Sequence, residues 1–97
     1  MANAIGVLET KGLVALVKGV DAMLKAANVS LAGQYKDVGS AYVSACIAGD
    51  VASVKAAVEA GATAAEEVGT VVSVHVIARP HADLPSLLSA AKAPVKK

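Results

Sequence analysis

Aromatic residues are nearly missing from this chain of 97 residues: Tyr35 and Tyr42 are the only two, and there is no Trp and no Phe. Hydrophobic residues still make up 56% of the sequence, and most of them are alanine and valine. A small domain buries only a modest share of its surface, so a core of such small side chains is thin in a single copy. With a mean hydropathy of +0.60, the composition predicts an oligomer that keeps apolar surface for a partner, the alternative being an alanine-rich monomer.

Excess charge and cysteine are also scarce. The 9 basic and 8 acidic residues give a formal net charge of +1, which argues against a nucleic-acid binder, because such proteins need a strongly basic surface. The single cysteine, Cys46, cannot form an internal disulfide, and its apolar neighbours indicate a small core residue in a reducing compartment. Neither a signal peptide nor an apolar run close to the roughly 18 residues of a membrane span is visible. We therefore predict a cytoplasmic protein.

The residue patterns of common active sites are missing as well. The two histidines, His75 and His81, are separated by six positions and by Pro80, which is not the spacing of a helical metal site. Ser40 lacks the Gly-x-Ser-x-Gly context of an activated serine. Neither a phosphate-binding loop nor a dinucleotide-binding fingerprint occurs. The sequence therefore predicts no enzymatic activity, no metal and no cofactor.

Hydrophobic periodicity divides the chain into strands and helices. The predicted strands are residues 4–8, 29–35, 42–47 and 71–77, and the predicted helices are residues 13–27 and 51–68. Asp50 is the expected N-cap of the second helix and Gly69 its expected stop. This order is that of the α+β, ferredoxin-like βαββαβ fold, with both helices on one face of an antiparallel four-stranded sheet. We expect one domain at 1–90, including a short C-terminal helix at 82–91, and then a flexible basic tail at 91–97.

The first predicted helix has a clear apolar pattern. Its apolar residues recur at helical spacing and are predicted to form one face: Leu13, Leu16, Val17, Val20, Leu24 and Ala27. Charged residues fall mainly on the other side. Among them, Asp21 precedes Lys25 by four positions, which is the favourable orientation for an ion pair on a helix.

Two short segments stand out from this regular pattern. The last predicted strand ends in an Arg-Pro corner, where Pro80 lacks a backbone N–H and restricts Arg79 to extended geometry. Arg79 is therefore expected to be held stiffly at an edge of the domain. The small residues Gly39, Ser40 and Ala41 form either an ordinary hairpin loop or a place where the backbone closely approaches another copy or a ligand.

Several segments together resemble the bacterial microcompartment (BMC) domain, a family of hexameric shell proteins, over about residues 4–88. They follow the family's order: AIGVLETKG at 4–12, DAMLKAANV at 21–29, GS at 39–40, GDV at 49–51, VKAA at 54–57 and VSVHVIARPH at 72–81. The resemblance implies a variant of the same βαββαβ fold in a structural protein. Six copies would form a disc with a central pore, and discs would tile into the shell of a carboxysome or metabolosome in the bacterial cytoplasm.

The resemblance also implies an edge between hexamers. Lys25, Asn28, Arg79 and His81 match residues of that edge. There the lysine lies antiparallel to its two-fold mate, with its alkyl stem packed. The arginine reaches backbone carbonyl groups of the facing subunit, which suits a planar group with several donors.

A pore loop is implied in the same way, by Gly39, Ser40 and Ala41. Six copies converge on the axis, so only small side chains leave an opening, through which small polar metabolites would pass. Near this loop, the sequence departs from the family pattern. The segment 33–39 is one residue longer than usual, and Ala41 replaces a frequent glycine. Asp37 precedes the loop and is a candidate for the vicinity of the pore, where it would disfavour anions if it faced the axis.

Two other functions are compatible with the fold class alone: a small oligomeric ligand-binding regulatory module and, with less support, a small enzyme. A shell tile is expected to bind copies of itself as a homohexamer, neighbouring hexamers, other shell proteins, enclosed enzymes and the metabolites that cross its pore. Nucleic acid and membrane are not expected partners. A regulator would instead stop at a discrete oligomer and bind a ligand, and an enzyme would turn over a substrate.

Overall fold

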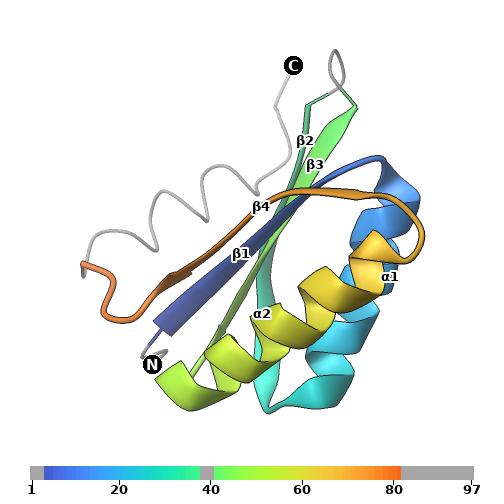
Figure 1. Cartoon of the computed structure of the whole chain (residues 1–97). Coiled ribbons are helices and arrows are strands. Elements are labelled where there is room, and N and C mark those ends of the chain that lie inside the picture. The colour runs from blue at the N-terminus through green and yellow to red at the C-terminus, as the bar shows by residue number, and fades with distance from the viewer. Residues whose placement is uncertain (1–3, 38–40, 82–97) are drawn as a thin grey trace.

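A computed structural model describes residues 4–37 and 41–81. In chain order, the described residues form β1 (Ala4–Lys11), α1 (Leu13–Ala26), β2 (Val29–Asp37), β3 (Tyr42–Gly49), α2 (Val51–Glu66) and β4 (Thr70–Ile77) (Figure 1). This order confirms the predicted α+β, βαββαβ fold. The predicted C-terminal helix at 82–91 and the tail at 91–97 lie outside the described residues.

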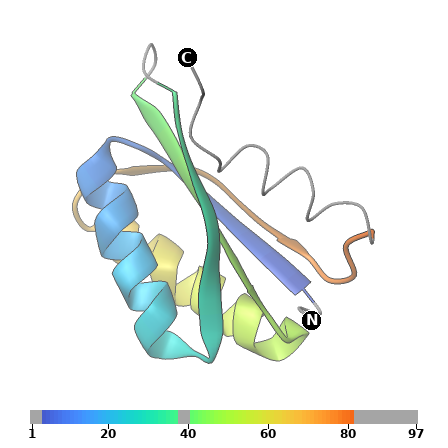
Figure 2. The ribbon, with the colours of Figure 1, turned by 180° about the vertical axis from the view of Figure 1, so that it is seen from behind.

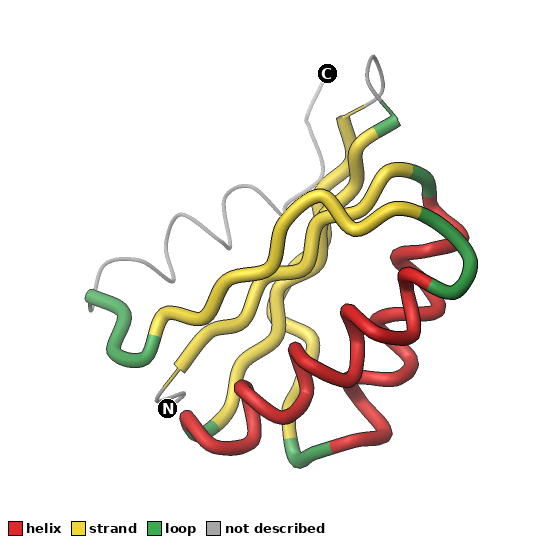
Figure 3. Tube along the Cα trace, in the orientation of Figure 1, coloured by secondary structure: helices red, strands yellow, loops and turns green. Residues whose placement is uncertain are grey.

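The four strands form one antiparallel sheet in the order β2-β3-β1-β4. β1 and β3 are therefore central, whereas β2 and β4 are edge strands. α1 and α2 cover the same face of the sheet, so residues 4–37 and 41–81 form two layers (Figure 2). Within the helical layer, α2 packs mainly on β1 and β4, while α1 packs mainly on β1 and β3 and reaches β2 (Figure 3).

β1 extends three residues beyond its predicted end. The sequence predicts a turn at 9–12, but in the structure Glu9, Thr10 and Lys11 pair with residues of β3 on one side and of β4 on the other. Backbone pairing on both sides, with a register shift between Glu9 and Thr10 on the β4 side, favours a strand over a turn. The chain turns only at Gly12, whose φ of 97° is readily adopted by glycine.

The core lies between the sheet and the two helices. Its largest fully buried side chains include Leu8 and Ile47 from the central strands and Met23 and Val54 from the helices. Tight packing of small and medium side chains therefore replaces the aromatic core that the composition rules out. Cys46 is also buried, as predicted.

The predicted apolar face of α1 is wrong in part. Leu16 is buried, but Leu13, Val17 and Leu24 are exposed. The stripe that α1 buries consists of Ala15, Leu16, Gly19 and Met23. Hydropathy predicts that the larger apolar side chains of α1 are buried. In the structure, the buried stripe is instead the one that contains Gly19, the smallest residue.

Close approach of the two helices explains this choice. A Cβ atom added to Gly19 would lie 2.5 Å from Leu8 Cδ2 and 3.1 Å from the carbonyl oxygen of Gly61 in α2. A Cβ atom on Gly61 would overlap Met23 and lie 3.0 Å from the carbonyl oxygen of Gly19. The backbones of α1 and α2 are thus too close for any side chain at these positions, so two glycines face one another at the crossing.

The start of α2 agrees with the predicted cap. The Asp50 carboxylate accepts hydrogen bonds of 2.9 Å from the backbone N–H and from the hydroxyl of Ser53. Both bonds favour the charged form and hold the pKa of Asp50 below its ordinary value. α2 ends at Glu66, two residues before its predicted end, and the Ala65 carbonyl accepts the N–H groups of Val68 and Gly69.

Candidate functional site

The sheet register defines two opposite ends of the molecule. The loop end is marked by a row of residues paired across all four strands: Asp37, Tyr42, Lys11 and Thr70. The edge end is marked by the paired residues at the other ends of the strands: Val29, Gly49, Ala4 and, one pair further in, Ile5 with Ile77. Strands of 8 or 9 residues, at about 3.3 Å per residue, separate the two ends by about 25 Å.

All four residues that the resemblance assigns to an assembly edge lie at the edge end. Lys25 is in the last turn of α1, Asn28 directly precedes β2, and Arg79 and His81 follow β4. Each of the four is exposed. Because β2 and β4 are opposite edges of the sheet, three strand spacings of about 4.8 Å separate their ends. The four residues therefore share the edge end of the molecule, but they are distributed across the width of the sheet at that end.

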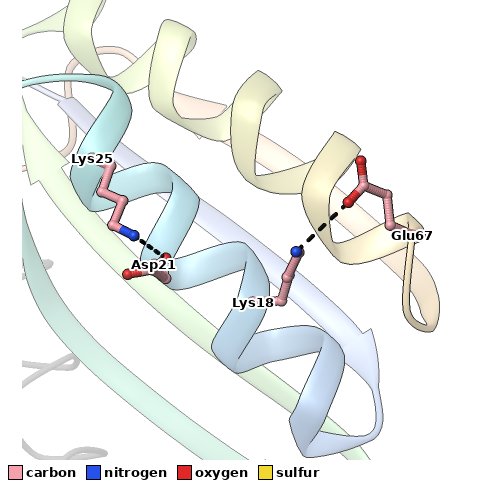
Figure 4. Close-up of polar contacts among 4 residues, drawn as sticks. All are labelled: Lys18, Asp21, Lys25 and Glu67. Atoms are coloured by element: carbon pink, nitrogen blue, oxygen red, sulfur yellow. Dashed lines mark ion pairs between the residues drawn. The ribbon is translucent and has the colours of Figure 1, made fainter.

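Lys25 has a defined partner within its own helix. Its Nζ atom lies 2.9 Å from Oδ2 of Asp21 (Figure 4). Both side chains are largely exposed, that of Lys25 by 76% and that of Asp21 by 60%. A second ion pair, Lys18 with Glu67, joins α1 to the chain just after α2 at 3.7 Å. The positive charge of Lys25 also lies at the C-terminus of α1, where the helix dipole favours a cation.

Only part of the predicted pore loop falls within the described residues. Gly39 and Ser40 lie outside them, as does the side chain of Asp37, whose backbone pairs with that of Tyr42. Ala41 is exposed and adopts a φ of 64°, in the region that favours glycine. Its carbonyl accepts the Gly12 N–H at 2.8 Å, which anchors the loop to the start of α1.

β2 continues two residues past its predicted end at 35, so its pairing with β3 reaches Asp37 and Tyr42. Only residues 38–41 therefore connect the two strands. β2 also has a register shift between Leu31 and Gly33, where it has one more residue than β3, and from Gly33 to Asp37 it pairs with β3 residue for residue.

Sequence reasoning missed a set of large apolar side chains that remain exposed. Near the start of α1, Leu13, Val14 and Val17 are 57%, 71% and 59% exposed. The others lie on β2, at the start of β3, after α2, on β4 and near the end of α1: Leu31, Tyr42, Val68, Val72 and Leu24. The signal in the sequence is that apolar residues occur on more than one face of α1, which a helix with a single partner does not need.

Metal-ligating groups, the cysteine and helix length further characterise the described residues. No group of three or more His, Cys, Asp or Glu side chains within 4–37 and 41–81 could hold a metal ion. Burial raises the pKa of the Cys46 thiol, which disfavours the reactive thiolate. In the same part of the chain, no helix has the length and apolar character needed to cross a membrane.

Comparison with known proteins agrees with this arrangement. Residues 4–80 match the family described as BMC domain. The chain is 53% identical over 86 residues to the bacterial microcompartment shell protein PduA of Salmonella typhimurium, covering 89% of this chain and 90% of that protein. It is 56% identical over 82 residues to the shell protein EutM of Escherichia coli, covering 84% of each.

The similarity extends to carboxysomes and to a solved structure. The carboxysome shell protein CcmK2 of Synechocystis is 47% identical over 90 residues, which cover 91% of this chain and 86% of the relative. The crystal structure of a microcompartment protein from Desulfitobacterium hafniense superposes with a TM-score of 0.78 at 31% identity. That alignment covers 97% of this chain and 50% of the solved chain.

These relatives decide between the functions that the fold class leaves open. They are structural shell proteins and not enzymes, which confirms the non-enzymatic interpretation and the location in a microcompartment shell. The resemblance found from the sequence motifs is confirmed across nearly all of the described residues. This chain therefore belongs to the BMC domain family and is a bacterial microcompartment shell protein.

Proposed function

We propose that this chain is a shell tile: six copies form a ring with a central pore, and rings join edge to edge into a facet. The observation that carries the proposal is the placement of the predicted residues. The edge residues and the loop lie at opposite ends of the strands, and these two ends are about 25 Å apart. A subunit with its loop at the centre of a ring then directs Lys25, Asn28, Arg79 and His81 to the rim.

The exposed apolar side chains support contact between copies. A closed ring of identical subunits needs two different, complementary surfaces on each chain. Exposed apolar side chains occur on the β2 side, where α1 carries Leu13 and Val17 and β2 carries Leu31, and on the β4 side, which carries Val72. Covering them with a second copy removes apolar surface from water, which is the dominant favourable term in association.

The rim has a different chemistry from these sides. Arg79 and Lys25 are exposed cations with many donors, and such groups suit carbonyl acceptors of a neighbouring ring. Each contact is expected to be weak, in the range of small interfaces. Six rims per ring act together, so avidity stabilises a facet whose individual contacts can still open and correct errors.

The proposal is tested by the mass of the particle in solution and by whether particles assemble into sheets. The purified protein is expected to sediment as a particle of six times its chain mass of 9.6 kDa and to form sheets or tubes under the electron microscope when concentrated. A chain that stays monomeric at every concentration would refute the proposal. A discrete oligomer that never tiles, but binds a ligand, would favour the regulatory module instead.

The pore is expected to respond strongly to Ser40→Leu. Six leucines at the axis would occlude a throat that the resemblance lines with small residues, because a change in one chain is repeated six times. We expect the flux of small polar solutes through rings in a planar bilayer, or across isolated shells, to fall about tenfold or more. Thr63→Leu, on the exposed side of α2, is the control. Unchanged flux through intact Ser40→Leu rings would show that this loop does not form the pore.

Enclosed enzymes and other shell proteins are the remaining proposed partners. They follow from the role of a tile, since a facet has an inner face and must meet tiles of other types. Small polar metabolites are the proposed solutes of the pore.

A further inference from the structure

Thr10 is a polar residue at a position of β1 that faces the core. Gly6 of the same strand faces α2, where an added Cβ atom would meet Val54 and Val58. Side chains alternate along a strand, so Leu8 and Thr10 face the helices as well, and Thr10 is 0% exposed. Valine has almost the same shape and would fill this position without burying a hydroxyl group, which costs free energy. Packing alone therefore does not explain a threonine here.

The Thr10 hydroxyl holds the residue that precedes α1. Its Oγ1 atom donates a hydrogen bond of 3.0 Å to the carbonyl oxygen of Gly12. The N–H of the same glycine donates a hydrogen bond of 2.8 Å to the carbonyl oxygen of Ala41. Gly12 is thus held on one side by a buried side chain and on the other by the last residue of the connection 38–41. These two bonds connect the core to Ala41 in series.

The backbone at both ends of the second bond depends on support. Ala41 has a φ of 64°, a left-handed conformation that costs free energy for any residue but glycine and persists where its surroundings hold it. Gly12 has a φ of 97°, and a Cβ atom added to it would meet nothing within 4 Å. Because no neighbour packs against Gly12 on that side, its hydrogen bonds are what fix its position.

The sheet is also irregular at this point. Glu9 pairs with Ser73 of β4, but Thr10 pairs with Val71, so Val72 is an extra residue on β4. Such a bulge changes the local twist and the direction of the side chains beside it, and bulges are frequent next to functional sites. The regular pairing of β1 with β4 is therefore interrupted at Thr10, two residues before Gly12.

We propose that Thr10 is a positioning residue for the pore: its hydroxyl fixes Gly12, and Gly12 in turn fixes Ala41. This inference rests on the proposed function, which places this end of the sheet at the axis of a ring of six copies. A displacement of Ala41 is then repeated six times around the axis, so a small shift in one chain changes the opening as a whole. Thr10 thereby helps to set the size of solute that passes.

Stability of the subunit does not depend on this hydroxyl. The carbonyl of a residue that precedes a helix also accepts the first hydrogen bond of that helix, so the Gly12 carbonyl keeps a partner when Thr10 is replaced. Valine retains the buried surface of the threonine side chain. Thr10→Val is therefore expected to leave the fold and the ring intact.

Three variants test the role of Thr10. Thr10→Val removes the hydroxyl at nearly constant shape, while Thr10→Ser keeps it. Thr70→Val is the matched control, because it makes the same change at an exposed position of β4 paired with Lys11. For each full-length protein, we would measure the ring mass, the hydrogen exchange of the Gly12 amide, and the flux of glycerol relative to that of sucrose across isolated shells.

The expected result is a change in two independent measurements for one variant. In Thr10→Val, the Gly12 amide should exchange about fivefold faster, the effect of losing one typical hydrogen bond on a local opening equilibrium. The ratio of glycerol flux to sucrose flux should fall about twofold or more, because a less firmly held Ala41 admits the larger solute. Thr10→Ser and Thr70→Val should match the unmodified protein in both measurements.

The contrary outcomes are distinct from failure of the proposed function. Unchanged exchange of the Gly12 amide in Thr10→Val would show that the hydroxyl does not hold Gly12. Faster exchange with an unchanged flux ratio would show that the bond has no role in the pore. Loss of the ring would also overturn the inference, since Thr10 would then support the subunit as a whole. Undiminished flux through Ser40→Leu rings would instead remove the pore assignment on which the inference rests.

Discussion

Arg79→Ala and Lys25→Ala are each expected to abolish extended sheets while the ring stays intact. Arg79 lies two residues after the end of β4, in front of Pro80, and is exposed at the edge end. Its planar guanidinium offers several donors in a fixed arrangement, and alanine offers none. Because each rim contact is expected to be weak and the proposed facet depends on many of them, the loss of a few kcal/mol per contact should be enough to end tiling.

Electron microscopy of concentrated protein and sedimentation of dilute protein check this prediction together. The ring should survive because the surfaces that we propose to join subunits are apolar and lie along the sides of the chain, whereas Arg79 lies at the edge end. Lys55→Ala, which removes an exposed lysine from α2, is the control for loss of positive charge. Arg79→Lys keeps the charge but loses the planar fork, so it should restore sheets only in part. Normal sheets from both alanine variants would remove the edge role of these residues.

Gly61→Val is expected to have the largest effect on folding of the subunit. Even the first atom of a new side chain would overlap Met23 and lie 3.0 Å from the carbonyl oxygen of Gly19. Met23 is fully buried, so it has little room to move, and the backbone oxygen can move only if α1 moves. We expect the free energy of unfolding to fall by about 3 kcal/mol, at the upper end of typical overpacking costs.

Thr63→Val is the matched control, because position 63 lies two residues further along the same helix and is exposed. Both variants place the same β-branched residue in α2, and valine has a better helix propensity than glycine. Helix propensity alone would therefore make Gly61→Val the milder change. Chemical denaturation of both proteins decides the matter: a Gly61→Val protein within about 1 kcal/mol of the control would contradict close packing at the crossing.

The fold could be read from the sequence because its signals are local. Alternation in 71–77 and helical spacing in 51–68 identify an element from its own residues, and Asp50 marks the start of α2 through a hydrogen bond to Ser53 only three positions away. Arg79 and Pro80 likewise place the end of β4 within two residues. None of these signals requires knowledge of a distant part of the chain.

The errors arose where a distant partner decides the outcome. β1 runs on to Lys11 because β3 and β4 both pair with residues 9–11, and the turn preference of that segment is outweighed. α1 buries the stripe with Gly19 because Gly61 of α2 faces it. Leu13 and Val17 belong to the apolar pattern of α1 but are left at the surface, available to another copy.

The candidate site divides in the same way. The sequence by itself determined the order of strands and helices, and it indicated which residues match the proposed assembly motifs, because both depend on residue type and short spacing. Only the tertiary structure decided that Lys25 and Arg79 share one end of the sheet, that the loop lies at the other, and which apolar side chains remain exposed. Those facts depend on strand register and helix packing, which are set by contacts between residues far apart in the chain.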